Sequence, residues 1–140
     1  MKKYSLLGSF VFLSLVSQAQ QTHNYRDQQE AFHFAKEYFQ KGQYNLAYPI
    51  LKELKQSLKE THRVNNQVMA QEVDYYTTVA ALKQNESRAE QDAQQYVEIT
   101  ENNARVQMMN FHLAEYYFRK QQFAEAAALY EKTDIANLSN

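Results

Sequence analysis

FAKEYFQKGQYNLA (residues 34–47) and LAEYYFRKQQFAEA (residues 113–126) are two stretches of this 140-residue chain in which similar residues follow the same order. Each begins with a large apolar residue and an alanine, continues through aromatic residues to a polar turn, and ends with another aromatic residue and a further alanine. Apolar residues three and four apart on both sides of the turn predict two amphipathic helices. Alanine at the crossing lets two helices approach closely, with bulky side chains on either side. Each stretch therefore predicts a pair of antiparallel helices.

The composition favours helices throughout the chain. The sequence contains two glycines, one proline and no cysteine, which is too few turn residues for an all-β fold and leaves no means of forming disulfides. A third, less regular helical pair is expected between the two stretches. The prediction is an all-α fold of about six helices, with units at residues 27–60, 66–100 and 104–133. Residues 134–140 are expected to be a linker to a further repeat or a C-terminal tail.

The two stretches resemble the tetratricopeptide repeat, a 34-residue helical hairpin with a small residue at the helix crossing and aromatic residues around the turn. Ala35 and Ala114 match the small position, and Gly42 matches the turn glycine. Because the two stretches are 79 residues apart, the middle unit is degenerate, and we align it with Tyr76 at the large position and Thr77 at the small one. The resemblance implies antiparallel hairpins stacked as a right-handed α-solenoid.

The first 19 residues have the pattern of a signal peptide. Two lysines precede an apolar run at residues 6–16, and small residues follow it. The run is shorter than the roughly 20 residues that a bilayer-spanning helix needs, so an uncleaved membrane anchor is the weaker alternative. We expect cleavage after residues 1–19, a flexible arm at residues 20–26, and export to the periplasm or the outer cell surface. A leader followed by irregular helical units is similar to repeat proteins exported by Bacteroidetes-type bacteria.

The charge and hydropathy of the chain argue against two classes of partner. The formal net charge is −1, and the lysines and arginines form no basic stripe of the kind that binds nucleic acid. Once the leader is removed, no apolar segment long enough for membrane insertion remains. The expected partner is another protein, or further tetratricopeptide-like repeats of the same chain.

The resemblance also implies where a partner would bind. In tetratricopeptide proteins, the first helix of each unit lines a concave groove that takes a peptide or a helix from another protein. The partner-binding candidates on this groove are Phe32, Lys36, Phe39, Asp74, Phe111, Glu115, Phe118 and Arg119, with Gln29, Gln40, Gln71, Thr78 and Met108 also facing it. Partly exposed phenylalanines beside polar groups are typical binding hot spots. The alternative is that these aromatic residues pack against the next repeat.

The sequence offers no pattern of residues for catalysis or for a cofactor. The histidines that follow the leader, none of them in a metal-ligand motif, are His23, His33, His62 and His112. His112 and Glu115 share a helix face, but no matching pair is evident on a facing helix. Ser57, Thr61 and Ser87 have no nearby His/Asp arrangement, and no glycine-rich loop could hold a phosphate. We expect no enzyme activity, no metal site and no cofactor.

Two functions are consistent with these patterns. The first is a protein-interaction scaffold of the cell envelope that binds a partner peptide or helix in a concave groove. The second is a purely structural segment of a longer repeat array, with no binding site of its own. The exposure of Phe32 and Phe111 distinguishes the two hypotheses, because a binding groove requires both side chains to be accessible.

Overall fold

The computed structural model describes residues 27–61 and 67–133, and all of its regular structure is helical. The helices in these ranges are α1 (Gln28–Gln40), α2 (Tyr44–Thr61), α3 (Gln67–Gln84), α4 (Ala89–Ile99), α5 (Asn103–Arg119) and α6 (Phe123–Tyr130). These ranges contain no strand, so the prediction of an all-α fold with about six helices is confirmed. The predicted leader, arm and C-terminal linker, at residues 1–19, 20–26 and 134–140, lie outside the described residues.

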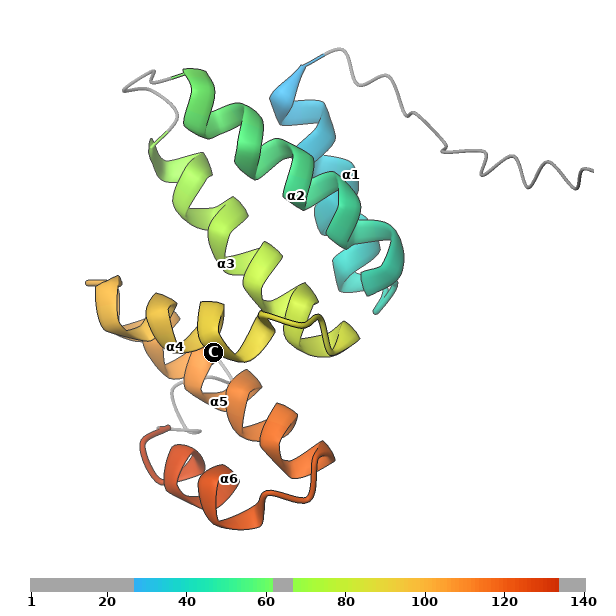
Figure 1. The fold of residues 1–140 in the computed structure, drawn as a ribbon. Coiled ribbons are helices and arrows are strands. Elements are labelled where there is room, and N and C mark those ends of the chain that lie inside the picture. Colours follow the sequence, from blue (N-terminus) through green and yellow to red (C-terminus); the bar gives the residue numbers. More distant parts are fainter. Residues whose placement is uncertain (1–26, 62–66, 134–140) are drawn as a thin grey trace, which may run out of the picture.

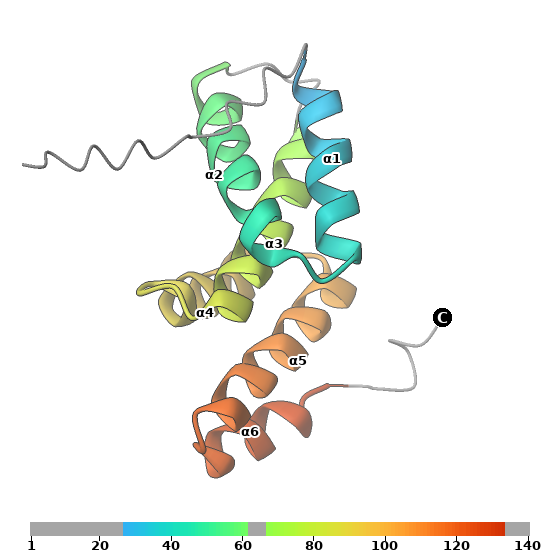
Figure 2. The ribbon, with the colours of Figure 1, turned by 90° about the vertical axis from the view of Figure 1, so that its right-hand side faces the viewer.

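The helices form three pairs that follow one another from one end of the molecule to the other (Figures 1 and 2). Each helix packs against the next one in the chain within the pairs α1–α2, α3–α4 and α5–α6. Between pairs, α2 packs against α3 and α4 packs against α5, while α3 also contacts both α1 and α5. The first helices of the three pairs therefore lie next to one another in the order α1, α3, α5.

The first helix of every pair ends in the same hydrogen-bonded turn. Gly42, Asn85 and Gln121 all have a left-handed backbone, with φ values of 71°, 57° and 62°. In each case the following N–H donates to the carbonyl five residues back: Gln43 to Tyr38 at 2.8 Å, Glu86 to Ala81 at 3.1 Å, and Gln122 to Tyr117 at 3.0 Å. This is the Schellman arrangement, which satisfies carbonyls that a helix end would otherwise leave unpaired.

The shared turn corrects the alignment of the middle unit. The three left-handed residues Gly42, Asn85 and Gln121 are 43 and 36 residues apart. Setting them in register places Thr78, rather than Thr77, at the small position. Thr78 is 3% exposed, and its hydroxyl donates to the carbonyl of Asp74 in its own helix at 2.9 Å. The alignment from sequence was one residue early because the middle turn has asparagine where the first turn has glycine.

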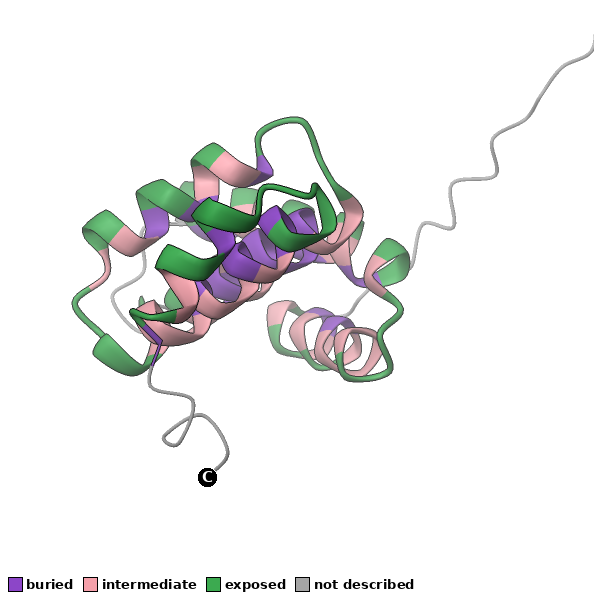
Figure 3. Ribbon diagram, turned by 90° about the horizontal axis from the view of Figure 1, so that it is seen from below, coloured by how far each residue is buried: buried purple, intermediate pink, exposed green. Residues whose placement is uncertain are grey.

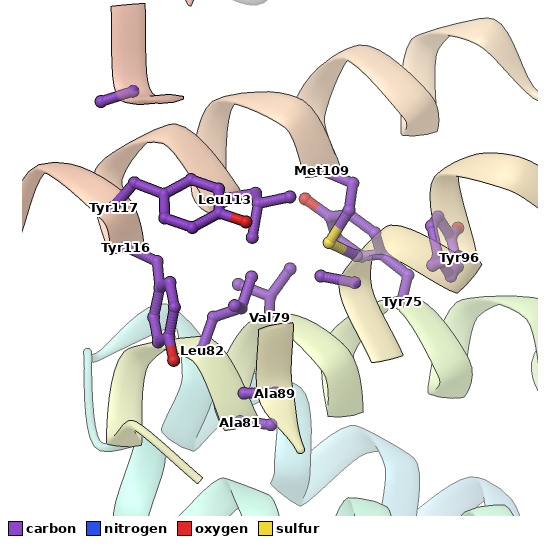
Figure 4. Close-up of a cluster of buried hydrophobic side chains, with 12 residues drawn as sticks. Tyr75, Val79, Ala81, Leu82, Ala89, Tyr96, Met109, Leu113, Tyr116 and Tyr117 are labelled. Atoms are coloured by element: carbon purple, nitrogen blue, oxygen red, sulfur yellow. The ribbon is translucent and has the colours of Figure 1, made fainter. Parts of the chain in front are cut away.

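The core runs through the centre of the stack, where the buried segments gather (Figure 3). Its largest cluster joins the last two pairs, and the fully buried side chains of Val79, Leu82 and Met109 lie in it (Figure 4). A second cluster brings Ala35 of α1 and Ala80 of α3 together with residues of α2. Alanine at these positions allows the close approach of neighbouring helices.

A polar contact fixes α4 against α5. The hydroxyl of Tyr117 donates to Glu90 Oε1 at 2.8 Å and accepts from Gln94 Nε2 at 2.9 Å. Burial and the Glu90 carboxylate together raise the pKa of Tyr117 to about 12. The phenol therefore stays protonated and remains a donor at neutral pH.

Candidate protein-binding face

Tyr76 lies at the centre of the face that α1, α3 and α5 share. Its ring meets the rings of Phe32 and Phe39 edge to face, at centroid distances of 5.9 and 4.8 Å. All three side chains are half-buried. Edge-to-face pairs contribute about 0.5–1.5 kcal/mol each beyond their buried area, so these rings hold α1 against α3. They also leave part of their aromatic surface accessible.

Two cations flank the ring of Tyr76, one from α1 and one from α5. Lys36 Nζ is 5.6 Å from the Tyr76 centroid and 5.4 Å from that of Phe32. Arg105 Cζ is 5.9 Å from the same Tyr76 centroid. A cation at this range is attracted to the negative face of a ring. We call Phe32, Lys36, Phe39, Tyr76 and Arg105 the Tyr76 cluster.

The two cations of the cluster differ in how they are neutralised. Arg105 forms an ion pair with Glu72, and its guanidinium also lies 4.2 Å from the centroid of Tyr75. Within the described residues, Lys36 contacts aromatic rings but has no carboxylate partner. The Arg105 charge is therefore neutralised by Glu72 within the molecule, whereas the Lys36 charge remains available to a ligand.

A second polar group lies further along α3 and α5. Lys83 Nζ is 2.6 Å from Glu115 Oε2, and His112 Nδ1 is 3.1 Å from the same oxygen. The hydrogen bond with His112 and the Lys83 ammonium lower the pKa of the Glu115 carboxyl to about 2, against the opposing effect of its burial. Arg119 Nη2 donates to the carbonyl of Leu82 at 2.9 Å. These contacts fasten α5 to α3 beside the Tyr76 cluster.

The structure brings several of the predicted residues together on this face. Phe32, Lys36 and Phe39 belong to the Tyr76 cluster, and Glu115 belongs to the second polar group. Met108 also contacts the Tyr76 cluster, since its sulfur lies 3.9 Å from Arg105 Nη1. Arg119 instead bonds to the carbonyl of Leu82 on α3. Gln29 and Gln40 are exposed on α1.

The predicted aromatic residues of α5 do not join the Tyr76 cluster. Phe111 is half-buried and its ring lies 5.8 Å from that of Tyr130 on α6. Phe118 is 57% exposed at the end of α5, beside Phe123 at a centroid distance of 5.4 Å. Phe111 therefore packs within its own helical pair, and Phe118 lies at the α5–α6 turn.

Asp74, Gln71 and Thr78 face the other side of α3. They line a hollow of about 470 Å³ between α2, α3 and α4, where Asp74 forms an ion pair with Lys55. A neighbouring hollow of about 440 Å³ shares Lys55 with it. A one-residue error in register rotates a helix position by about 100°, which is why the misaligned middle unit placed these residues on the wrong side.

Tyr76 and Arg105 are the residues of the cluster that the sequence did not identify. Tyr76 was assigned to the large apolar position of the middle unit, and Arg105 was not singled out. Asn85 is a signal for the register of α3, because asparagine also adopts the left-handed conformation of a helix end. That register places Tyr75, and not Tyr76, at the position of Phe32, so no local signal identifies Tyr76.

Comparisons with known proteins give no relative: no family model, no curated protein and no solved structure matches the chain. Across the described ranges, no three histidine or acidic side chains are placed so that they could hold a metal ion. None of the helices in those same ranges is both long and apolar enough to cross a membrane.

Proposed function

We propose that this chain is a protein-interaction scaffold that binds a peptide or helix of a partner protein across α1, α3 and α5. The observation that carries the proposal is the Tyr76 cluster, in which accessible aromatic surface lies beside a lysine with no carboxylate partner in the described structure. Aromatic residues with nearby cations are enriched among the side chains that dominate binding energy at protein interfaces.

The order of the helices supports a tetratricopeptide-like stack. Such a stack requires the first helices of successive pairs to lie side by side, as α1, α3 and α5 do. Each of these helices also ends in the same left-handed turn. Under this proposal the pairs form a right-handed solenoid whose inner surface is the α1–α3–α5 face. The signal-peptide pattern of residues 1–19 supports a location in the periplasm or on the outer cell surface.

The test compares two charge reversals on different sides of the molecule. Lys36→Glu changes the charge inside the Tyr76 cluster, whereas Lys52→Glu makes the same change on the exposed surface of α2. Each protein is immobilised and used to capture partners from a cell-envelope extract of the native host, and the captured proteins are quantified by mass spectrometry. Affinities are then measured by calorimetry with the purified partner.

We expect the partner to bind wild type and Lys52→Glu, and to bind Lys36→Glu about tenfold or more weakly, because the reversed charge faces it. Lysine reversal is preferable to truncating Phe32, since loss of that ring would also weaken the packing of α1 on α3. A partner that both variants retain, or that both lose equally, contradicts the proposed face.

The second candidate, a structural segment of a longer array, is favoured by a different observation. Phe118 and Phe123 are 57% and 58% exposed at the last helical pair. Large aromatic residues with so much exposed surface are typical of a face that another element covers. This candidate predicts that Lys36→Glu and Lys52→Glu leave every captured partner unchanged.

A further inference from the structure

The second helices of the first two pairs, α2 and α4, lie on one side of α3, whereas α1 and α5 lie on the other (Figure 2). Both α2 and α4 pack on α3, but they make little contact with each other. The two hollows of about 470 and 440 Å³ lie in the space between them and share the lining residues Lys55, Lys59, Asp92 and Gln95. They therefore form one continuous groove, which we call the α2–α4 groove.

Small and apolar side chains line the inside of this groove. Ala70 and Ala81 of α3 and Ala89 of α4 are among them. At one end of the groove, Leu58 and Ile99 add larger apolar surface, and Ile99 is 66% exposed. Small residues allow a second backbone to approach a helix closely. The groove therefore has a lining against which a further helix could pack.

One wall of the groove carries a lysine on each successive turn of α2. Lys52, Lys55 and Lys59 all line it. Lys55 forms an ion pair with Asp74 of α3. Lys52 and Lys59 are exposed, and neither has a carboxylate partner within the described ranges. The lysines on either side of the Lys55–Asp74 pair are therefore unneutralised.

The acidic residues of the opposite wall do not neutralise both of these lysines. Asp92 of α4 lies 3.9 Å from Arg88, with which it is paired. Glu86, in the turn before α4, is the remaining acidic residue among those that line the groove. Two unpaired lysines thus face one unpaired carboxylate. The groove carries a positive charge, although the formal net charge of the chain is −1.

We propose that the α2–α4 groove binds an acidic amphipathic helix of a partner protein. Lys52 and Lys59 are seven residues apart, which is about 10 Å along the axis of α2. Two carboxylates seven residues apart on a partner helix have the same spacing, and they would repeat the contact that Asp74 makes with Lys55. Apolar residues three and four positions after the first carboxylate lie on the same side of that helix, where they meet the alanines of the groove.

This inference is independent of the proposed function, because the Tyr76 cluster lies on the other side of α3. The test uses synthetic helical peptides of about 20 residues rich in alanine and glutamine, long enough to form a helix in water. The first carries two glutamates seven residues apart, with leucines three and four positions after the first glutamate. The second has glutamine in place of both glutamates. The third has the composition of the first, but its glutamates are five residues apart and lie on different sides of the helix.

Calorimetry with the full chain measures the dissociation constant of each peptide. We expect the first peptide to bind with a Kd below about 1 mM, and the other two to bind about tenfold or more weakly. Lys59→Glu should weaken binding of the first peptide by about tenfold or more, because it replaces an attraction with a repulsion. Lys59→Gln should weaken it less, and this variant keeps the test informative if Lys59→Glu fails to fold.

The matched control is Lys36→Glu, which makes the same change on α1 and should leave binding of the first peptide unchanged. Lys52→Glu, the control for the Tyr76 cluster, should weaken it. Each lysine reversal is thus the control for the other side of α3, and the two binding surfaces can fail separately.

Three results would overturn the proposal. One is no binding of the first peptide at about 1 mM. Another is equal binding of the first peptide and either of the other two, which would mean that apolar contact or general attraction to lysines accounts for it. The third is a loss with Lys36→Glu as large as that with Lys59→Glu. None of these results would change partner capture by the Tyr76 cluster.

Discussion

The left-handed turn residues give a quantitative test of the fold. Gly42 and Gln121 have nearly the same backbone, with φ values of 71° and 62°, but only glycine adopts it without strain. The left-handed conformation costs a residue with a Cβ roughly 1–2 kcal/mol. Removing glycine recovers about 0.4–1 kcal/mol by restricting the unfolded chain. The difference predicts that Gly42→Ala destabilises the protein by about 0.5–1 kcal/mol.

The same calculation with the opposite sign applies to Gln121→Gly, which should stabilise the protein by a similar amount. The Cβ of Gly42→Ala would meet no atom within 4 Å, so no steric clash adds to the cost. The matched control is Gln122→Gly, because Gln122 has a φ of −88° and no strain to relieve. It should be neutral or destabilising.

Thermal and urea unfolding, followed by far-UV circular dichroism, measures these changes. For a domain of this size, about 0.5–1 kcal/mol corresponds to a change in Tm of about 2–8 °C. We expect Gly42→Ala to lower the Tm and Gln121→Gly to raise it. If Gln121→Gly lowers the Tm as much as Gln122→Gly does, residue 121 does not have a left-handed backbone and the shared turn is refuted.

Two further substitutions test the contacts of α3 and α5. The pKa of Glu115 is lowered in the folded state from 4.5 to about 2, so its contribution to stability is complete above pH 4.5 and is lost as the pH falls towards 2. Glu115→Gln should therefore flatten the fall in stability over this range, as measured by urea unfolding at several pH values. Thr78→Ala should change the stability by less than about 1 kcal/mol, since the hydroxyl bonds only within its own helix. Thr78→Leu should cost about 1–3 kcal/mol by overpacking the contact, as measured by urea unfolding at neutral pH.

The outer helical pairs could be predicted from the sequence because their signals are local. Residues 34–47 and 113–126 combine helical periodicity with a turn, and both features depend on neighbours in the chain. The structure confirms helices on both sides of each turn. The Gln121 turn was located without glycine because aromatic residues and alanines mark both of its sides.

The middle pair was harder to predict because its first helix, α3, is buried on several sides and shows little amphipathic periodicity. Helix α3 packs against α1, α2, α4 and α5, so its own buried residues lie on several of its sides. Its sequence therefore lacks the single apolar stripe that marks an amphipathic helix. A one-residue error in its register then moved Asp74 to the position of Phe32, which the Asn85 turn assigns to Tyr75. The contact of Arg105 with Tyr76 depends on how α5 lies against α3, some thirty residues away in the chain, and no local signal reports it.

The burial of α3 has a consequence for how the molecule opens. Eight of the 18 residues of α3 are buried, whereas α6 buries one residue. Helices at the ends of a stack can separate while the centre stays intact, but α3 cannot leave without breaking its contacts with both neighbouring pairs. Its amide hydrogens should exchange with solvent last, and those of α6 first. The middle hairpin, which has the least regular sequence, thereby sets the cooperativity of the whole fold.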